Sequence, residues 1–226
     1  MSIRRLLRKL YLRLREPPER ASDVVRSYGE YLRLQRDVYL SHEADVEGWA
    51  AGLRRFTALA VEGLPRTSRV LDCACGDGVA LDELRRLGFR DPAGVELASE
   101  KAARARALGF QVEERDMHDL GAFADGSFDL VLSSHTLEHA YEPARVLAEL
   151  RRVLVPGGAL RVVLPYPDAG AGNELAHAAK YELGTHLDDG GASVTRFFVD
   201  RGFDLESSRL DSVREPEIWL FLRKGR

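Results

Sequence analysis

Short apolar runs alternate with amphipathic stretches along the chain after residue 68. The apolar runs cover residues 69–74, 93–97, 111–116, 128–134 and 159–166. Stretches with helical spacing of their apolar residues follow three of them, at residues 79–89, 99–110 and 143–154. Nearly continuous apolar strands separated by helices are typical of a parallel sheet that is covered on both faces. This pattern predicts an α/β fold.

Two apolar runs near the end of the chain have no helix between them. Residues 203–210 and 217–224 therefore predict an antiparallel pair that closes the sheet. Trp219 lies in the second run, which is apolar almost throughout, so we expect it in the core. A helix over residues 194–202 precedes the pair, with Ser193 as the expected cap.

The first 64 residues have a different, wholly helical pattern. Residues 1–15 alternate leucines with arginines at helical spacing, and further helices are predicted over 23–40 and 44–63. We therefore predict a helical cap over residues 1–64 and a second domain over 65–226. The basic helix of residues 1–15 suits packing on its own domain or on a second subunit, as in a homodimer. The alternative is contact with an acidic partner or an anionic membrane surface.

Composition narrows the possible function classes. The chain has 226 residues, 45% hydrophobic and 31% charged, and a net charge of -3, which argues against a nucleic-acid partner. No apolar run approaches the roughly 20 residues that span a membrane. Cys73 and Cys75 are one residue apart on a predicted strand and point to opposite faces, so they are poorly placed to form a disulfide. A cytoplasmic location is expected.

Residues 70–84, VLDCACGDGVALDEL, pass from a strand through a turn of small residues into a helix. Ligands of open α/β sheets bind at this kind of crossover, where the helix presents free amides. The dinucleotide pattern G-x-G-x-x-G does not fit, because its third glycine position holds Val79. The turn also carries Asp72 and Asp77, which would repel a pyrophosphate but suit a positively charged ligand.

This turn, VLDCACGDG, resembles the first motif of the class I S-adenosylmethionine-dependent methyltransferases, V-L-D-x-G-C-G-x-G. Ala74 stands in place of the usual first glycine and is expected to crowd the turn slightly. The resemblance covers residues 69–167. It implies a Rossmann-like, seven-stranded, mostly parallel sheet with helices on both faces. It also implies S-adenosylmethionine as cofactor and S-adenosylhomocysteine as product.

The resemblance assigns cofactor roles at the ends of successive strands. Glu96 would accept the ribose hydroxyls, and Asp116 and Met117 would contact the adenine. The residues that the resemblance places against the cofactor are Asp72, Ala74, Gly76, Asp77, Gly78, Glu96, Leu97, Asp116, Met117 and Ser134.

The segment His135-Thr136-Leu137-Glu138-His139 allows two interpretations. It fits H-x-x-E-H, the signature of one class of zinc peptidases, which requires both histidines on one long helix. Here the segment directly follows a predicted buried strand, and Pro143 favours a helix that begins later. We therefore expect a loop at the carboxyl end of the strand, with no metal, in which His135 or His139 removes a proton from the methyl acceptor. A structural role remains open, with His139 fixing the turn and Glu138 capping a helix.

A pocket for the acceptor is expected after residue 167. His177, Lys180, Tyr181 and His186 lie there, and His177 and Lys180 would share one face of a helix. The resemblance favours O-methylation of a small molecule, such as a sugar or a biosynthetic intermediate. The alternatives are a catalytically silent protein that binds the cofactor and docks a partner, and a zinc hydrolase that uses His135 to His139.

Overall fold

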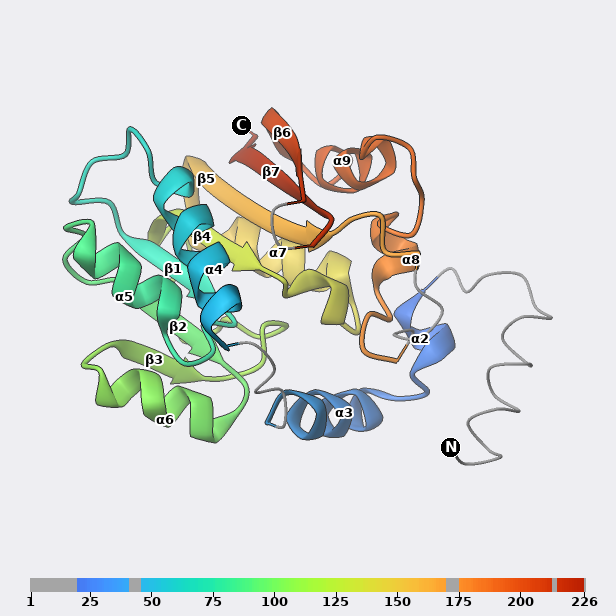
Figure 1. Cartoon of the computed structure of the whole chain (residues 1–226), viewed down its shortest axis with the longest axis horizontal. Helices are drawn as coiled ribbons and strands as arrows, with labels where there is room; N and C mark the ends of the chain where they lie inside the picture. Colours follow the sequence, from blue (N-terminus) through green and yellow to red (C-terminus); the bar gives the residue numbers. More distant parts are fainter. Residues whose placement is uncertain (1–19, 41–45, 170–174, 213–214, 226) are drawn as a thin grey trace.

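The computed structural model describes residues 20–40, 46–169, 175–212 and 215–225 (Figure 1). A seven-stranded sheet with the order β3-β2-β1-β4-β5-β7-β6 forms its centre. The strands are β1 (Val70–Cys73), β2 (Ala93–Glu96), β3 (Gln111–Glu114), β4 (Phe128–Ser134), β5 (Leu154–Pro165), β6 (Phe203–Asp211) and β7 (Glu217–Lys224). Strands β1 to β5 are parallel, and β7 pairs antiparallel with both β5 and β6. The predicted Rossmann-like sheet is confirmed.

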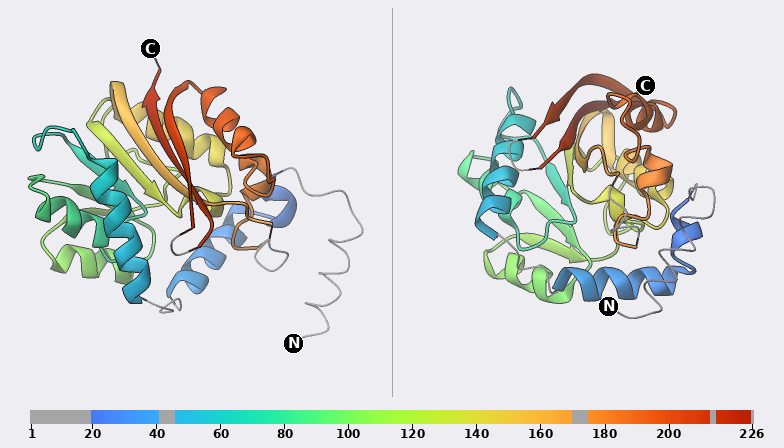
Figure 2. Two further views of the ribbon diagram at one scale, coloured as in Figure 1. Left: turned by 45° about the horizontal axis from the view of Figure 1, so that its top comes forward. Right: turned by 45° about the vertical axis from the view of Figure 1, so that its right-hand side comes forward.

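Helices cover both faces of this sheet (Figures 1 and 2). They are α2 (Ala21–Val24), α3 (Tyr28–Leu40), α4 (Val46–Ala60), α5 (Val79–Arg86), α6 (Ser99–Ala107), α7 (Pro143–Val153), α8 (Lys180–Leu183), α9 (Ala192–Val199) and the 3-10 helix η1 (Leu137–His139). Among the described residues, no helix has the length and apolar character needed to cross a bilayer.

Two apolar clusters, one on each face, hold these layers together. Helix α7 begins at Pro143, whose missing amide hydrogen costs nothing in the first turn, and buries Val146, Leu147 and Leu150 on one face. On the other face, α4 and α5 bury Phe56 and Leu81 together with apolar residues of the strands. Because α4 contributes to this cluster, this helix packs directly on the sheet.

The structure corrects the prediction of one helix over residues 23–40. The chain is extended at Val25, and α3 starts afresh after Ser27. The Ser27 hydroxyl accepts a hydrogen bond from the Glu30 amide at 3.2 Å, and the Glu30 carboxylate accepts one from the Arg26 amide at 2.9 Å. This reciprocal capping favours a new helix start. The predicted helix of residues 1–15 lies outside the described residues.

A second correction concerns the start of α9. Its N-cap is Gly191, in a left-handed conformation, rather than Ser193. The Asp189 carboxylate accepts hydrogen bonds from the amides of Gly191 and Ser193, at 3.1 and 2.9 Å, and so satisfies the free donors of the helix.

Helix α3 lies beside the carboxyl ends of the parallel strands (Figure 2). Its Tyr31 ring packs edge-on against His118, which follows β3, with centroids 5.3 Å apart. About one turn later, the Gln35 amide donates to the carbonyl of His139, which follows β4, at 3.2 Å. The helix therefore spans the edge of the sheet at which ligands of this fold class bind.

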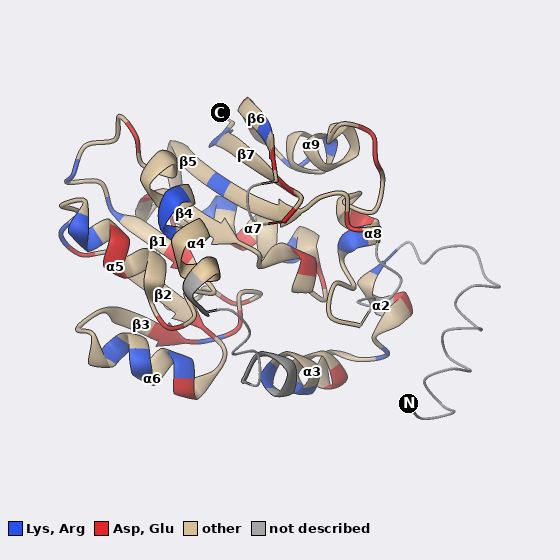
Figure 3. Cartoon of the chain, in the orientation of Figure 1, with Lys and Arg blue, Asp and Glu red and all other residues tan. Residues whose placement is uncertain are grey.

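Charged residues are distributed unevenly around the sheet (Figure 3). Helix α6 carries the basic residues Lys101, Arg104 and Arg106, whereas β3 and the segment after it are acidic, with Glu113, Glu114, Asp116 and Asp119.

Cys73 and Cys75 are buried free thiols, as the sequence predicts.

Candidate functional site

The turn between β1 and α5 is held in a conformation that suits small residues. Gly76 and Gly78 have φ angles of 53° and 86°, and Gly78 is the N-cap of α5. A Cβ at Gly78 would lie 3.2 Å from the Cβ of Ala105 on α6. Ala74 also has a positive φ, 63°, which is strained for a residue with a side chain. The turn brings the free amides of α5 to the edge of the sheet.

Two carboxylates lie beside this turn, at the ends of β1 and β2. The Glu96 side chain accepts hydrogen bonds from the amides of Gly76 and Ala98, at 2.9 and 2.8 Å, and so ties the turn to β2. Asp72 is 4% exposed. Burial, followed by repulsion from Glu96, raises the pKa of Asp72 to about 7. A cationic ligand would relieve both effects.

A third carboxylate, Asp116, follows β3. Its Oδ1 atom accepts a hydrogen bond from the His118 amide at 2.8 Å and also contacts the His118 ring. Burial acts to raise the pKa of Asp116, but its contacts with His118 and, to a smaller extent, with the Tyr28 hydroxyl outweigh burial, and the pKa is lowered. Its Oδ2 atom is buried without a hydrogen-bond partner among the described residues, so it remains to accept a donor such as an exocyclic amine. Met117 is buried next to it.

The other predicted cofactor residues differ in position. Asp77 is turned away from the carboxylates and forms a 2.7 Å ion pair with Arg104 at the surface. Leu97 is half-buried after Glu96, and Ser134 ends β4. Asp77 therefore links the turn to α6 through an exposed ion pair, whereas Leu97 and Ser134 lie at the strand ends.

His135 begins the segment after β4, in a left-handed conformation with φ of 50°. Its Nε2 atom lies 2.9 Å from a carboxylate oxygen of Glu217, and its Nδ1 atom lies 3.5 Å from Glu138. Burial acts to lower the pKa of His135, but its interactions with Glu138 and Glu217 outweigh burial and raise it. The buried Trp219 indole donates to Glu217 at 2.9 Å, which confirms Trp219 as a core residue and orients the carboxylate.

A small cavity opens beside His135. It is lined by Trp49, Gly52, Leu53, Phe56, Ser134, His135, Val163 and Glu217. The Trp49 ring packs against the His135 ring, with centroids 5.0 Å apart. The predicted loop at the end of β4 thus places an oriented histidine next to an apolar recess.

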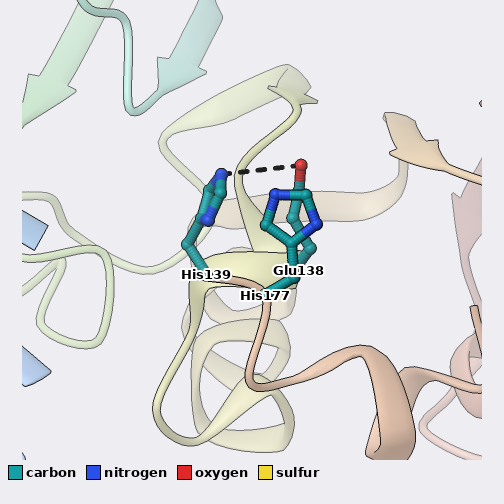
Figure 4. Close-up of side chains that lie close together, drawn as sticks. All are labelled: Glu138, His139 and His177. Atoms are coloured by element: carbon teal, nitrogen blue, oxygen red, sulfur yellow. Dashed lines mark ion pairs between the residues drawn. The ribbon is translucent and has the colours of Figure 1, made fainter. Parts of the chain in front are cut away.

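His139 and Glu138 lie in η1 and face His177, which comes from the segment after β5 (Figure 4). The structural interpretation, in which Glu138 caps a helix, is wrong, because neither oxygen of Glu138 accepts a hydrogen bond from a described helix amide. Glu138 is 1% exposed, and neither of its oxygens has a hydrogen-bond partner among the described residues. Burial lowers the pKa of His139 to about 4, so this histidine is neutral at pH 7. Because η1 is only three residues long, the long helix that the zinc-peptidase signature requires is not formed by these residues.

The four predicted acceptor residues, His177, Lys180, Tyr181 and His186, do not form one site. His177 and Lys180 do not share a helix face, since α8 begins only at Lys180. His177 packs against His139, with ring centroids 4.9 Å apart, whereas Lys180 is buried. Tyr181 packs against His186, at 5.0 Å. Of the four predicted acceptor residues, His177 is the one that the structure brings next to Glu138 and His139.

Several residues of this edge escaped the sequence analysis. Tyr31 and Trp49 belong to helices whose docking no local pattern reveals. Glu217 did have a signal: an antiparallel β7 must begin at the edge where β5 ends, and Glu217 pairs with Pro165. His118 follows the predicted Asp116 by two residues, but its contact with that carboxylate depends on the turn.

Comparison with known proteins agrees with this geometry. Residues 71–162 match the family described as a methyltransferase domain. The match agrees with the methyltransferase family that the sequence motifs resemble. The matched residues run from within β1 to within β5 and contain the His135–His139 segment, and they agree with the predicted family and its S-adenosylmethionine cofactor.

Relatives and solved structures extend the comparison. The chain is 39% identical over 102 residues to a ubiquinone biosynthesis O-methyltransferase of Xanthomonas axonopodis pv. citri, a match that covers 42% of each protein. A protein of the same name from Albidiferax ferrireducens is 32% identical over 126 residues, 50% of each. The match therefore spans half or less of these relatives' length.

The fold extends beyond the methyltransferase domain itself. The [4+2]-cyclase SpnF superposes with a TM-score of 0.65 at 18% identity, covering 92% of this chain and 98% of SpnF. Magnesium protoporphyrin IX methyltransferase from Synechocystis PCC 6803, with bound SAM, superposes with a TM-score of 0.63 at 17% identity, covering 86% and 97%. At these identities the likeness concerns the fold alone, which does not fix the reaction.

Proposed function

We propose that the protein transfers the methyl group of S-adenosylmethionine to an oxygen atom of a small molecule, such as a sugar or a biosynthetic intermediate. The observation that carries the proposal is the set of three carboxylates, Asp72, Glu96 and Asp116, at adjacent strand ends around a glycine turn. The printed names of the relatives, O-methyltransferases, favour an oxygen acceptor. The helices before residue 65 cap the site in this proposal.

The residues present fit the cofactor. Asp72 would favour its cationic end, the Glu96 oxygens retain lone pairs for ribose hydroxyls, and the unpartnered oxygen of Asp116 would accept from the adenine amine. S-adenosylmethionine supplies an activated methyl carbon. The protein's part is to align the acceptor with that carbon and to exclude water.

His135 is the better of the two predicted bases. Its pKa is raised, and Glu217 orients its ring, whereas burial makes His139 a weak base. His135 would take the proton of the acceptor hydroxyl as the oxygen bonds to the methyl carbon. The carbon–sulfur bond breaks with its electron pair on sulfur, which leaves S-adenosylhomocysteine and a methyl ether.

Calorimetry with S-adenosylmethionine tests the cofactor site. We expect Glu96→Ala to weaken binding by about 1.5–3 kcal/mol, the scale of hydrogen bonds to a charged group. Glu113→Ala is the matched control, because it removes an exposed carboxylate from the neighbouring strand β3. Thermal unfolding of both variants separates lost ligand contacts from a loosened turn, since Glu96 also holds Gly76.

Two outcomes would contradict the proposal in different ways. Equal affinity in wild type and Glu96→Ala would refute the ribose assignment. Tight cofactor binding without methyl transfer to any oxygen acceptor in a broad screen would favour the alternative of a catalytically silent cofactor-binding protein.

A further inference from the structure

Glu138 is the least satisfied charged group in the described part of the chain. Its carboxylate is 1% exposed, and both of its oxygens lack a hydrogen-bond partner there. The nearest donors are ring nitrogens of His135 and His139, at 3.5 and 3.6 Å, which is too long for a good hydrogen bond. A buried carboxylate in this condition is costly unless a further positive group completes its surroundings.

His139 and His177, which both face Glu138, are each oriented by a hydrogen bond from their Nδ1 atom. The Nδ1 atom of His139 lies 2.8 Å from the carbonyl oxygen of Ala176, so it donates there, and its Nε2 atom is directed at Glu138. The Nδ1 atom of His177 lies 2.8 Å from the buried carboxylate of Asp168. Histidines that bind metals commonly donate their other ring nitrogen to a carbonyl or a carboxylate in this way, which fixes the tautomer.

We propose that Glu138, His139 and His177 bind one divalent first-row transition-metal ion, such as Zn²⁺. Their ligand atoms all lie within 4.8 Å of one another (Figure 4). Ligands about 2.1 Å from a tetrahedral zinc are roughly 3.4 Å apart. The separation of 3.6 Å between Glu138 Oε1 and His139 Nε2 is close to that value.

The donor set specifies the kind of ion. Two imidazoles and one carboxylate suit zinc or iron(II) better than magnesium or calcium, which prefer oxygen ligands. Three protein ligands leave a coordination position for a further group. The His139 and His177 side chains are 11% and 20% exposed, so an ion can reach them from solvent.

This site differs from the zinc-peptidase interpretation of the sequence. The set omits His135, which pairs with Glu217, and takes His177 from a segment 38 residues after His139. If the proposed function is correct, the ion lies beside the base His135. There it would bind the acceptor oxygen and favour its deprotonation, so this role rests on that function.

Zinc titration of the full chain, after chelator treatment and without cofactor, tests the site. We expect one zinc ion per chain, with a dissociation constant of about 1 µM or below. Glu138→Gln and His177→Ala should each weaken binding about 100-fold or more, and Asp168→Asn about tenfold. His186→Ala is the matched control, because it removes the histidine that packs on Tyr181, and it should bind as wild type does.

Cobalt(II) substitution gives a second readout, because a wild-type visible absorption band should disappear in His177→Ala. Binding of S-adenosylmethionine by each variant shows that it is folded. No stoichiometric binding, or equal affinity in wild type and Glu138→Gln, would overturn the proposal. Loss of binding in Glu217→Gln alone would overturn it too, by moving the ion to the neighbouring group of His135, Glu215 and Glu217. Cofactor binding without zinc binding refutes this inference alone, and zinc binding without cofactor binding refutes the proposed function alone.

Discussion

Replacement of Asp72 by asparagine should remove a pH dependence from cofactor binding. Asp72 is buried, and burial together with Glu96 raises its pKa from 3.8 to about 7. One pKa unit corresponds to about 1.4 kcal/mol. Ionising Asp72 in the ligand-free protein therefore costs roughly 4 kcal/mol more than ionising an aspartate that is exposed to solvent. Because the folded state holds the proton more tightly than the unfolded chain, this group makes stability fall as pH rises from about 4 to 7.

A cationic ligand reverses this preference, since it favours the ionised carboxylate. At pH 5.5 only about 3% of the ligand-free protein has Asp72 ionised, against half at pH 7. The affinity for S-adenosylmethionine should therefore rise about 15-fold over this interval, with uptake of the ligand releasing nearly one proton at pH 5.5 and about half a proton at pH 7. The interval ends at pH 7 because α-amino groups lose their own protons near pH 7.7–8.

Calorimetry at pH 5.5, 6.2 and 7.0, in buffers of different ionisation enthalpy, measures both the affinity and the released proton. Asp72→Asn should bind more weakly at pH 7 but with an affinity nearly independent of pH. Asp91→Asn, which changes an exposed carboxylate before β2, should keep the wild-type slope. A wild-type affinity that does not change with pH would refute the reasoning.

Four further substitutions test the turn, the base with its carboxylate partner, and the core. Ala74→Gly should raise the free energy of unfolding by about 0.5–1 kcal/mol in urea, because it relieves a positive φ of 63°; a loss would contradict the strain. His135→Ala should lower kcat about 100-fold and Glu217→Gln about tenfold, with KM little changed; steady-state kinetics giving the reverse order would reject the assigned roles. Phe56→Ala should cost about 3–5 kcal/mol in urea unfolding, since Phe56 is 2% exposed; a cost below 1 kcal/mol would show that it is not a core anchor.

The sheet was predictable from the sequence because its signals are local. Strands buried on both faces read as apolar runs, and Pro143 marks the start of α7. The break between α2 and α3 was missed because the apolar periodicity continues across it. The capping pattern from Ser27 to Glu30 carried the information, but it is short and needs the structure to distinguish it from chance.

The candidate site was predictable only where strand ends define it. Asp72, Glu96 and Asp116 each follow or end a recognisable strand, so the sheet brings them together. The surroundings of Glu138 could not be predicted, because His177 lies outside the helices and strands, between β5 and α8. The ion pair of Asp77 with Arg104 likewise depends on how α6 packs on the turn.

Helix α3 touches the chain on both sides of the proposed reaction centre, through Tyr31 at His118 and Gln35 at the His139 carbonyl. One helix therefore rests on His118, which contacts the proposed cofactor residue Asp116, and on His139, which lies beside the proposed acceptor site. A displacement of this helix would therefore disturb the cofactor side and the acceptor side of the proposed site together. We expect a compound held on one side to slow departure from the other.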